Sequence, residues 1–330
     1  MKKKKIRATD LRIESDGAII QQVNKIDGRV SEIRDHVNHP WQRELIFADK
    51  VKWDKVCSCM DVLGDTQLAI DHFFTLQKFS GDNGGHLYLY GLLQAIFLQQ
   101  DAANHLSEAL FNKSIKWKRD YPNLYMIREL RNDAAGHPTK RGDNESFHYI
   151  ARHSVSKNHF ELASYFPKKK KFEHRSVYIR DIIEKHENSI CEILDKIIEQ
   201  MKSILKNHKK KFKGRKLIDF VPSDFGYSVE KVFEGIYNKY PLAEMNFKLL
   251  KKSYEAIKSE IDQRYTTYKA ISGVNNLVNQ IDHIISRLED WISNKNLYQN
   301  KDAEVFMTAF DDRFEELKEM LVEIDKEFNC

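Results

Sequence analysis

The residues whose types and spacing could carry chemistry lie between positions 131 and 137, in the sequence RNDAAGH. Arginine presents a planar fork of donors that matches the oxygens of a phosphate. Histidine gives or takes a proton near neutral pH. Held together, these side chains could cleave RNA without a metal ion, with His137 as general acid or base and Arg131 stabilising the growing charge on the phosphate. Asn132 could orient His137 or the phosphate by hydrogen bonding.

The chain before and after this segment must bring Arg131 and His137 together, because residues six positions apart lie on different faces of a helix. Apolar residues at helical spacing predict a helix here: Leu124, Ile127, Leu130 and Ala134. Gly136 followed by Pro138 is a strong stop signal. We predict that Gly136 has a positive φ as a left-handed C-cap, which folds His137 back beside Arg131. The alternative is an ordinary helix end, with Arg131 solvated and His137 bound to a terminal carbonyl.

The segment resembles the signature of the HEPN family, in which an arginine, often followed by asparagine or aspartate, precedes a histidine by a few residues. Here Asn132 follows Arg131, and five residues separate Arg131 from His137. The resemblance covers residues 50–210 at most. It implies a helical bundle and a homodimer that brings the Arg/His pairs of both chains into one cleft. It also implies metal-independent ribonuclease activity, often in toxin–antitoxin or phage-defence systems.

Composition favours long helices in a protein with more than one domain. A chain of 330 residues is long enough to bury a sizeable core. Its 13 glycines and six prolines are few, which favours helices over turn-rich sheets. Its 19 phenylalanines and 14 tyrosines argue against a disordered chain. The net charge of +5 is mildly basic, well short of a protein that coats nucleic acid.

Cysteines and apolar runs indicate the compartment. The four cysteines, Cys57, Cys59, Cys191 and Cys330, include no pairs at zinc-ligand spacing and indicate free thiols in a reducing cytoplasm. The sequence contains no long uncharged apolar run, so we predict no membrane span. The start, residues 1–5, lacks the apolar core of a signal peptide. We expect a cytoplasmic protein without metal or cofactor.

We predict a mainly α fold: a HEPN-like antiparallel helical bundle with an inserted β-hairpin, followed by a second helical domain. The predicted domains are an N-terminal helical arm at 1–50, the bundle at 51–210 and a C-terminal domain at 217–330, in which we see no catalytic constellation. The basic segment that contains Gly214 marks the boundary. Besides the motif helix, apolar periodicity predicts helices at 11–37, 42–50, 52–79, 86–112, 175–207, 228–239, 241–270, 274–294 and 300–328.

Four further segments have other patterns. Residues 146–153 and 159–166 predict the β-hairpin at about 146–166, which could clamp a substrate or build a dimer contact. The four-lysine run at 168–171 predicts a solvated loop. Ser80–Gly85 predicts a plain turn, since no Lys-Ser/Thr follows its glycines. Residues 117–122 interleave basic and aromatic side chains, which suits either single-stranded RNA or a loop that ends at Pro122 with a packed Trp117.

These patterns predict an endoribonuclease that leaves a 2′,3′-cyclic phosphate. RNA is the expected substrate because the nucleophile is the ribose 2′-hydroxyl, which DNA lacks. The chemistry needs both an acid and a base, so a two-fold dimer would supply the second Arg/His pair. A regulatory protein could be a further partner. The alternatives are a non-catalytic HEPN-like module that binds a nucleotide, RNA or a protein with the pair idle, and a purely structural scaffold.

Overall fold

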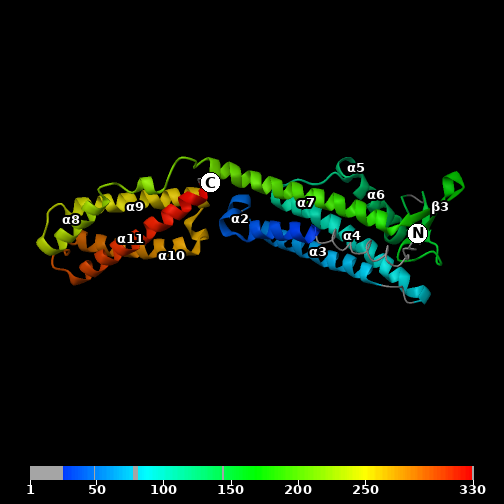
Figure 1. Ribbon diagram of the computed structural model, residues 1–330, viewed down its shortest axis with the longest axis horizontal. Helices are drawn as coiled ribbons and strands as arrows, with labels where there is room; N and C mark the ends of the chain where they lie inside the picture. Colours follow the sequence, from blue (N-terminus) through cyan, green and yellow to red (C-terminus); the bar gives the residue numbers. More distant parts are fainter. Residues whose placement is uncertain (1–24, 48, 77–80, 143–144, 329–330) are drawn as a thin grey trace, which may run out of the picture. The chain divides into compact units, whose positions relative to one another are not determined.

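The computed structural model describes residues 25–47, 49–76, 81–142 and 145–328, which form a mainly α-helical protein with one small sheet (Figure 1). The predicted fold class is confirmed. Within these ranges no helix is long and apolar enough to cross a membrane. The predicted basic tail at 1–10 lies outside the described residues, as does the first part of the helix predicted at 11–37, whose described part spans residues 25–38.

The chain divides into two compact units. The first contains the described residues up to His36 together with Phe47–Met201, and the second contains Val37–Ile46 together with the described residues from Lys202 onward. This division differs from the predicted one. The segment predicted as an arm at 1–50 is shared between the units, and the second unit begins within a helix instead of at residue 217.

Long helices build the first unit. In chain order the labelled helices are α3 (Lys50–Thr75), α4 (Gly81–Phe111), α5 (Trp117–Asp120), α6 (Pro122–Arg131) and α7 (Ile179–Lys210). Their lengths follow from the apolar periodicity that the sequence shows. The turn predicted at Ser80–Gly85 is wrong from residue 81 onward, because α4 already begins at Gly81. Glycine is accepted at a helix N-terminus, so the glycines there do not break the helix.

An antiparallel sheet with strand order β1-β2-β3 follows the motif. Strands β1 (Phe147–Ile150) and β2 (His159–Phe166) form the predicted hairpin. Strand β3 (Lys171–Tyr178) was predicted partly as loop and partly as helix, and α7 begins at Ile179 instead of 175. The reason is that all of β3 except Val177 is exposed. The apolar–polar alternation of a half-buried strand is therefore missing from its sequence.

One face of the sheet packs against the helices. Phe160 and Leu162 of β2 and Val177 of β3 belong to the same core as Ile127 and Leu130 of α6. Phe160 is directly opposite Val177 in the β2–β3 register, and successive strand residues point to opposite faces. The apolar face of the sheet thus covers the end of the motif helix. The opposite face of the sheet is exposed to solvent.

The second unit is helical in its described part. Its elements include the last turns of α7, α2 (Pro40–Ile46), α8 (Phe225–Asn238), α9 (Ala243–Tyr265), α10 (Ser272–Ser293) and α11 (Lys301–Phe328). The predicted helix at 241–270 ends earlier, at Tyr265, because Thr266 takes a positive φ of 64°. Trp41 is fully buried, with its ring centroid 5.6 Å from those of Tyr265 and Phe328.

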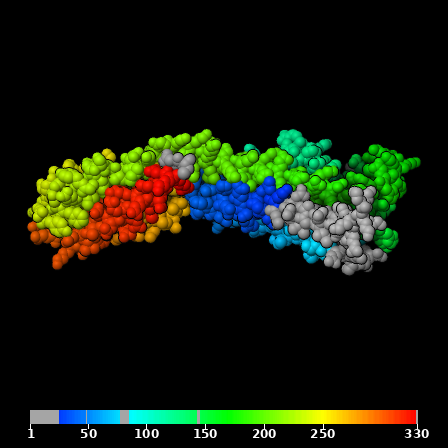
Figure 2. All heavy atoms as spheres, in the orientation of Figure 1, coloured from blue at the N-terminus to red at the C-terminus, as the bar shows by residue number. Residues whose placement is uncertain are grey.

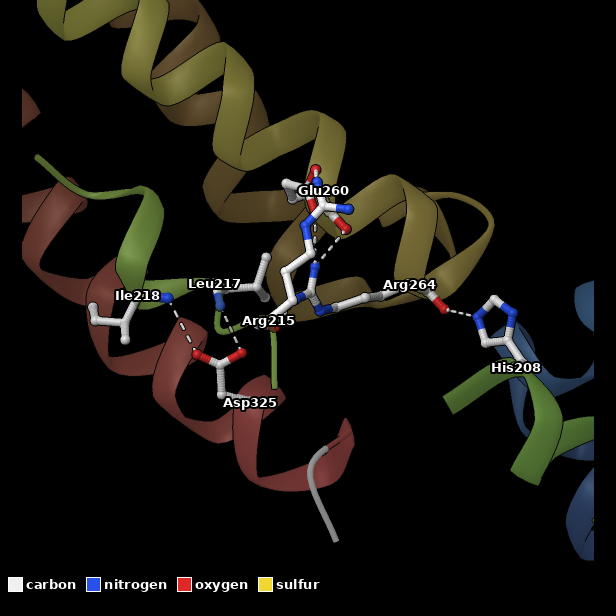
Figure 3. Close-up of polar contacts among 7 residues, drawn as sticks. All are labelled: His208, Arg215, Leu217, Ile218, Glu260, Arg264 and Asp325. Atoms are coloured by element: carbon white, nitrogen blue, oxygen red, sulfur yellow. Dashed lines mark hydrogen bonds and ion pairs between the residues drawn. The ribbon is translucent and has the colours of Figure 1, made fainter. Parts of the chain in front are cut away.

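A buried ion network fastens the segment after α7 to α9 (Figure 3). The side chain of Arg264 has no exposed surface. Its Nη1 donates to Glu260 Oε2 at 3.1 Å, and its Nη2 donates to the carbonyl oxygen of Arg215 at 2.5 Å. The Arg215 guanidinium donates to the other carboxylate oxygen of Glu260. Glu260 therefore neutralises two guanidinium groups, one of which is wholly buried.

Two further side chains, Asp325 and His208, form hydrogen bonds in the same region. Asp325 of α11 accepts the backbone N–H groups of Leu217 at 2.7 Å and Ile218 at 3.1 Å. His208 Nε2 donates to the carbonyl oxygen of Arg264 at 2.6 Å, and burial lowers the pKa of this histidine. These bonds satisfy backbone groups that would otherwise be buried without partners.

Candidate active site

The predicted site lies where α6 ends, and the chain there forms a π-helical turn, Asn132–Gly136. The N–H of His137 donates to the carbonyl oxygen of Asn132 at 2.7 Å, five residues back. Gly136 does not have a positive φ, so the predicted left-handed cap is wrong. The wider turn satisfies the Asn132 carbonyl, and Pro138 stops the helix because it has no N–H to continue the hydrogen-bond pattern. Such turns are frequent at functional sites.

Arg131 is half-buried and held on several sides. Its Nη2 donates to Gln94 Oε1 at 2.6 Å and its Nη1 donates to Asn132 Oδ1 at 3.2 Å. Its Cζ lies 4.4 Å from the ring centroid of Phe97, within cation–π range. Its Nε is buried and has no hydrogen-bond partner among the described residues. The guanidinium is thus fixed in place and keeps one N–H on each terminal nitrogen for another acceptor.

Gly136 allows the guanidinium to lie against the chain just before His137. A Cβ at position 136 would sit 2.5 Å from Arg131 Nη1 and 3.2 Å from Asn132 Oδ1. Any other residue would therefore push the Arg131 side chain away. Glycine is needed at position 136 because the side chains of Arg131 and Asn132 lie so close to it. The sequence had instead suggested that glycine is needed there for a left-handed backbone conformation.

His137 is exposed, and its ring has no hydrogen-bond partner in the described part of the chain. Among these residues no hydrogen bond joins the imidazole ring itself to the side chain of Arg131 or Asn132. The Asn132 side chain instead binds Arg131, so the contact it makes here orients the guanidinium. The backbone of His137 is fixed by its bond to the carbonyl oxygen of Asn132 at 2.7 Å, and its imidazole is exposed to solvent.

Helix α4 supplies partners that sequence reasoning missed. Gln94 and Phe97 hold Arg131, and Phe97 also lies 4.2 Å from the Arg128 Cζ. Arg128 Nη1 donates to Asp101 at 2.7 Å, and its guanidinium lies 5.0 Å from the Trp117 ring centroid. Trp117 thus packs on Arg128, but residues 117–120 form the short helix α5 and not the loop predicted there. These contacts depend on how α4 and α6 pack, which no local pattern encodes.

A second polar network ties the π turn to the sheet. Arg141 Nε lies 2.9 Å from Asp133 Oδ1, and its Nη2 donates to Glu129 at 2.5 Å. His148 is buried between the hydroxyls of Ser146 and Ser164, each 2.8 Å away. Burial raises the pKa of Asp133 and lowers that of His148. This histidine has its ring nitrogens occupied, so we assign it a structural role.

Two negative findings limit other chemistry at the described residues. No three His, Cys, Asp or Glu side chains there come together as a set of metal ligands. A groove of about 170 Å³ runs between α6, β3 and α7, with Met126, Leu130, Arg175 and Lys185 in its lining, but neither Arg131 nor His137 lines it. This groove is therefore separate from the candidate site at the π turn, where Arg131 is half-buried and His137 is exposed.

Comparisons with protein-family models, with curated proteins and with solved structures found no match to this chain.

Proposed function

We propose that the protein is a metal-independent endoribonuclease with HEPN-like chemistry. Arg131 binds and stabilises the scissile phosphate, His137 transfers a proton, and Asn132 positions the Arg131 guanidinium. The observation that carries the proposal is the guanidinium held against Gly136, directly before an exposed histidine. One such pair supplies one proton-transfer group, whereas the reaction needs an acid and a base. A homodimer would bring two pairs into one site.

The setting we propose is the cytoplasm, in a toxin–antitoxin or phage-defence system with a regulatory partner. Among the described residues, Cys59 and Cys191 are free thiols, which suits a reducing compartment. The rival function is a non-catalytic module that binds RNA, a nucleotide or a protein. It draws support from the contacts that already hold Arg131 within the chain, since a guanidinium engaged by Gln94 and Phe97 could serve packing alone.

A direct test separates these functions. Purified protein should cut mixed single-stranded RNA in the presence of a chelator and leave 2′,3′-cyclic phosphate ends, because the nucleophile comes from the substrate itself. An RNA with a 2′-deoxy sugar at the cut position should resist cleavage there. End-group analysis of the products by mass spectrometry gives the readout. Loss of cutting in chelator, with cutting retained in Arg131 and His137 variants, would exclude this mechanism.

The Gly136→Ala substitution tests the close approach of the guanidinium. The new Cβ would meet Arg131 Nη1 at 2.5 Å, and the long arginine side chain can yield. We therefore expect cleavage to fall by about tenfold or more, while the thermal unfolding midpoint changes little. Gly91→Ala is the matched control, because nothing lies within 4 Å of its added Cβ. Equal cleavage rates for the two variants would show that the position of Arg131 does not matter.

A further inference from the structure

The solvent face of the sheet is lined with rings. Cross-strand partners point to the same side, and the register pairs Phe147 with Tyr165, Tyr165 with Phe172, and His159 with Tyr178. The two-residue period of the strands adds Tyr149 and His174 to this side. We call this surface the aromatic face, formed by Phe147, Tyr149, His159, Tyr165, Phe172, His174 and Tyr178.

Most of these rings are open to solvent. The exposed fractions are 53% for Tyr149, 59% for Phe172 and 58% for Tyr178. Tyr165 stacks on Phe172 with their ring centroids 4.5 Å apart and their planes at 27°. The same side also carries Ala163 and the polar pair Glu161 and Ser176, but the fold does not require aromatic residues on the side away from its core, and exposed apolar patches rimmed by polar residues often mark binding sites.

Positive charge borders the aromatic face. Lys171, Glu173 and Arg175 alternate with Phe172, His174 and Ser176 along β3 and so point to the opposite side of the sheet, which leaves the lysines of the preceding turn as the positive charge next to the aromatic face. Lys168–Lys170 lie in the turn between β2 and β3, where Lys170 has a φ of 48°. In the space-filling view this green segment lies at the molecular surface (Figure 2).

The sheet is also attached to the candidate active site. The N–H of His148 in β1 donates to the carbonyl oxygen of Pro138 at 2.7 Å, and Arg141 forms an antiparallel bridge with Ser146. The end of the π turn therefore runs along β1, at the edge of the sheet opposite β3. With strands about 4.8 Å apart, His137 lies roughly 15 Å from β3 across the sheet.

We propose that the aromatic face binds single-stranded RNA, with bases stacked on its rings and phosphates near the lysine turn. This inference rests on the proposed function and adds a path for the substrate: a strand laid across the sheet from β3 to β1 arrives at Arg131 and His137. Unpaired bases can stack on aromatic side chains, whereas those of a duplex are already stacked. A protein partner fits less well, because protein interfaces are depleted in lysine.

The test measures binding without cleavage. A fluorescent single-stranded RNA with methylated 2′-hydroxyls cannot supply the nucleophile, so its affinity for the wild-type protein is measured by anisotropy. We expect Phe172→Ala and Tyr178→Ala each to weaken binding by about tenfold, and Phe172→Trp to retain it. Tyr227→Ala is the matched control, because that ring is 55% exposed in the second unit. Its affinity should stay unchanged, and duplex RNA of the same length should bind more weakly.

The lysine turn gives a second, independent readout. Replacing Lys168, Lys169 and Lys170 by Gln should reduce the slope of log affinity against log salt by about 2, at roughly 0.7 per phosphate contact on a single strand. Unchanged affinity in the aromatic variants would overturn the inference, and continued cleavage of ordinary RNA would then leave the proposed function intact. Binding through the aromatic face without any cleavage would support this inference and overturn the proposed function. A dimer that dissociates in Phe172→Ala with RNA affinity unchanged would show that the face joins two copies of the chain.

Discussion

Replacing His137 by alanine should reduce RNA cleavage by a hundredfold or more, and Arg131→Ala should have an effect of similar size. A positioned proton donor or acceptor contributes about 10²–10⁴-fold to a rate, and removing a donor to the developing charge costs about 10²–10³-fold. Initial rates on a defined single-stranded RNA give the measurement. His137 is exposed, so its variant should unfold at the wild-type temperature, which separates lost chemistry from lost structure.

The Arg131→Lys variant distinguishes geometry from charge. Lysine keeps the charge but lacks the planar fork, so it cannot bind Gln94, Asn132 and a phosphate at the same time. We expect Arg131→Lys to be nearly as inactive as Arg131→Ala. Arg119→Lys is the control, since Arg119 is an exposed arginine that pairs with Asp120 at 2.6 Å. Full activity in Arg131→Lys would mean that any cation suffices there.

A substitution at Gln94 also tests whether the position of the Arg131 guanidinium matters for cleavage. Its side-chain oxygen accepts from Arg131 Nη2 at 2.6 Å, so Gln94→Leu would remove a contact that positions the guanidinium and leave the Phe97 ring in place. Cleavage should fall, by less than in Arg131→Ala. The dependence of rate on RNA concentration should show a loss in kcat as well as in binding, because a misplaced arginine no longer meets the charge of the transition state.

The contact between Arg131 and Gly136 shows how much of the candidate site local sequence patterns can predict. The residues RNDAAGH and the stop at Pro138 correctly located the end of a helix, but they suggested the wrong kind of ending. A left-handed cap and a π turn both place a polar residue after glycine, and the choice between them depends on tertiary contacts. Arg131 packs against Phe97 of α4, and that contact has no signature in the residues near position 131.

The sheet also shows which elements local sequence patterns can and cannot predict. The alternating residues of β1 and β2 predicted a hairpin because one face of those strands is buried. In β3 only Val177 is buried, so nothing in its residue pattern distinguishes a strand from a charged loop. The strand exists because its backbone pairs with β2 along its whole length. The aromatic face therefore becomes visible only when the register places Phe172 and Tyr178 beside the rings of β2.

The ion network of the second unit should respond strongly to removal of its acid. Glu260→Leu would leave Arg264 buried and Arg215 nearby, both without their shared carboxylate. Breaking a buried ion pair on one side typically costs about 3–5 kcal/mol. Arg264→Met should cost less, because Glu260 would still pair with Arg215. The double variant Glu260→Leu/Arg264→Met should recover part of the loss, since no unpaired buried charge remains.

Denaturant unfolding of the four proteins gives the free-energy differences, and hydrogen exchange locates them. Faster exchange is expected in peptides from α9 and in the segment around Leu217, which the same network holds. Glu244→Leu is the control on the same helix: its pair with Lys248, at 2.6 Å, is exposed on both sides and should contribute little. If Glu260→Leu unfolded at the same denaturant concentration as Glu244→Leu, the buried carboxylate would be dispensable. The second unit would then be held together by its apolar core alone, with Trp41 and Phe328 among its central rings.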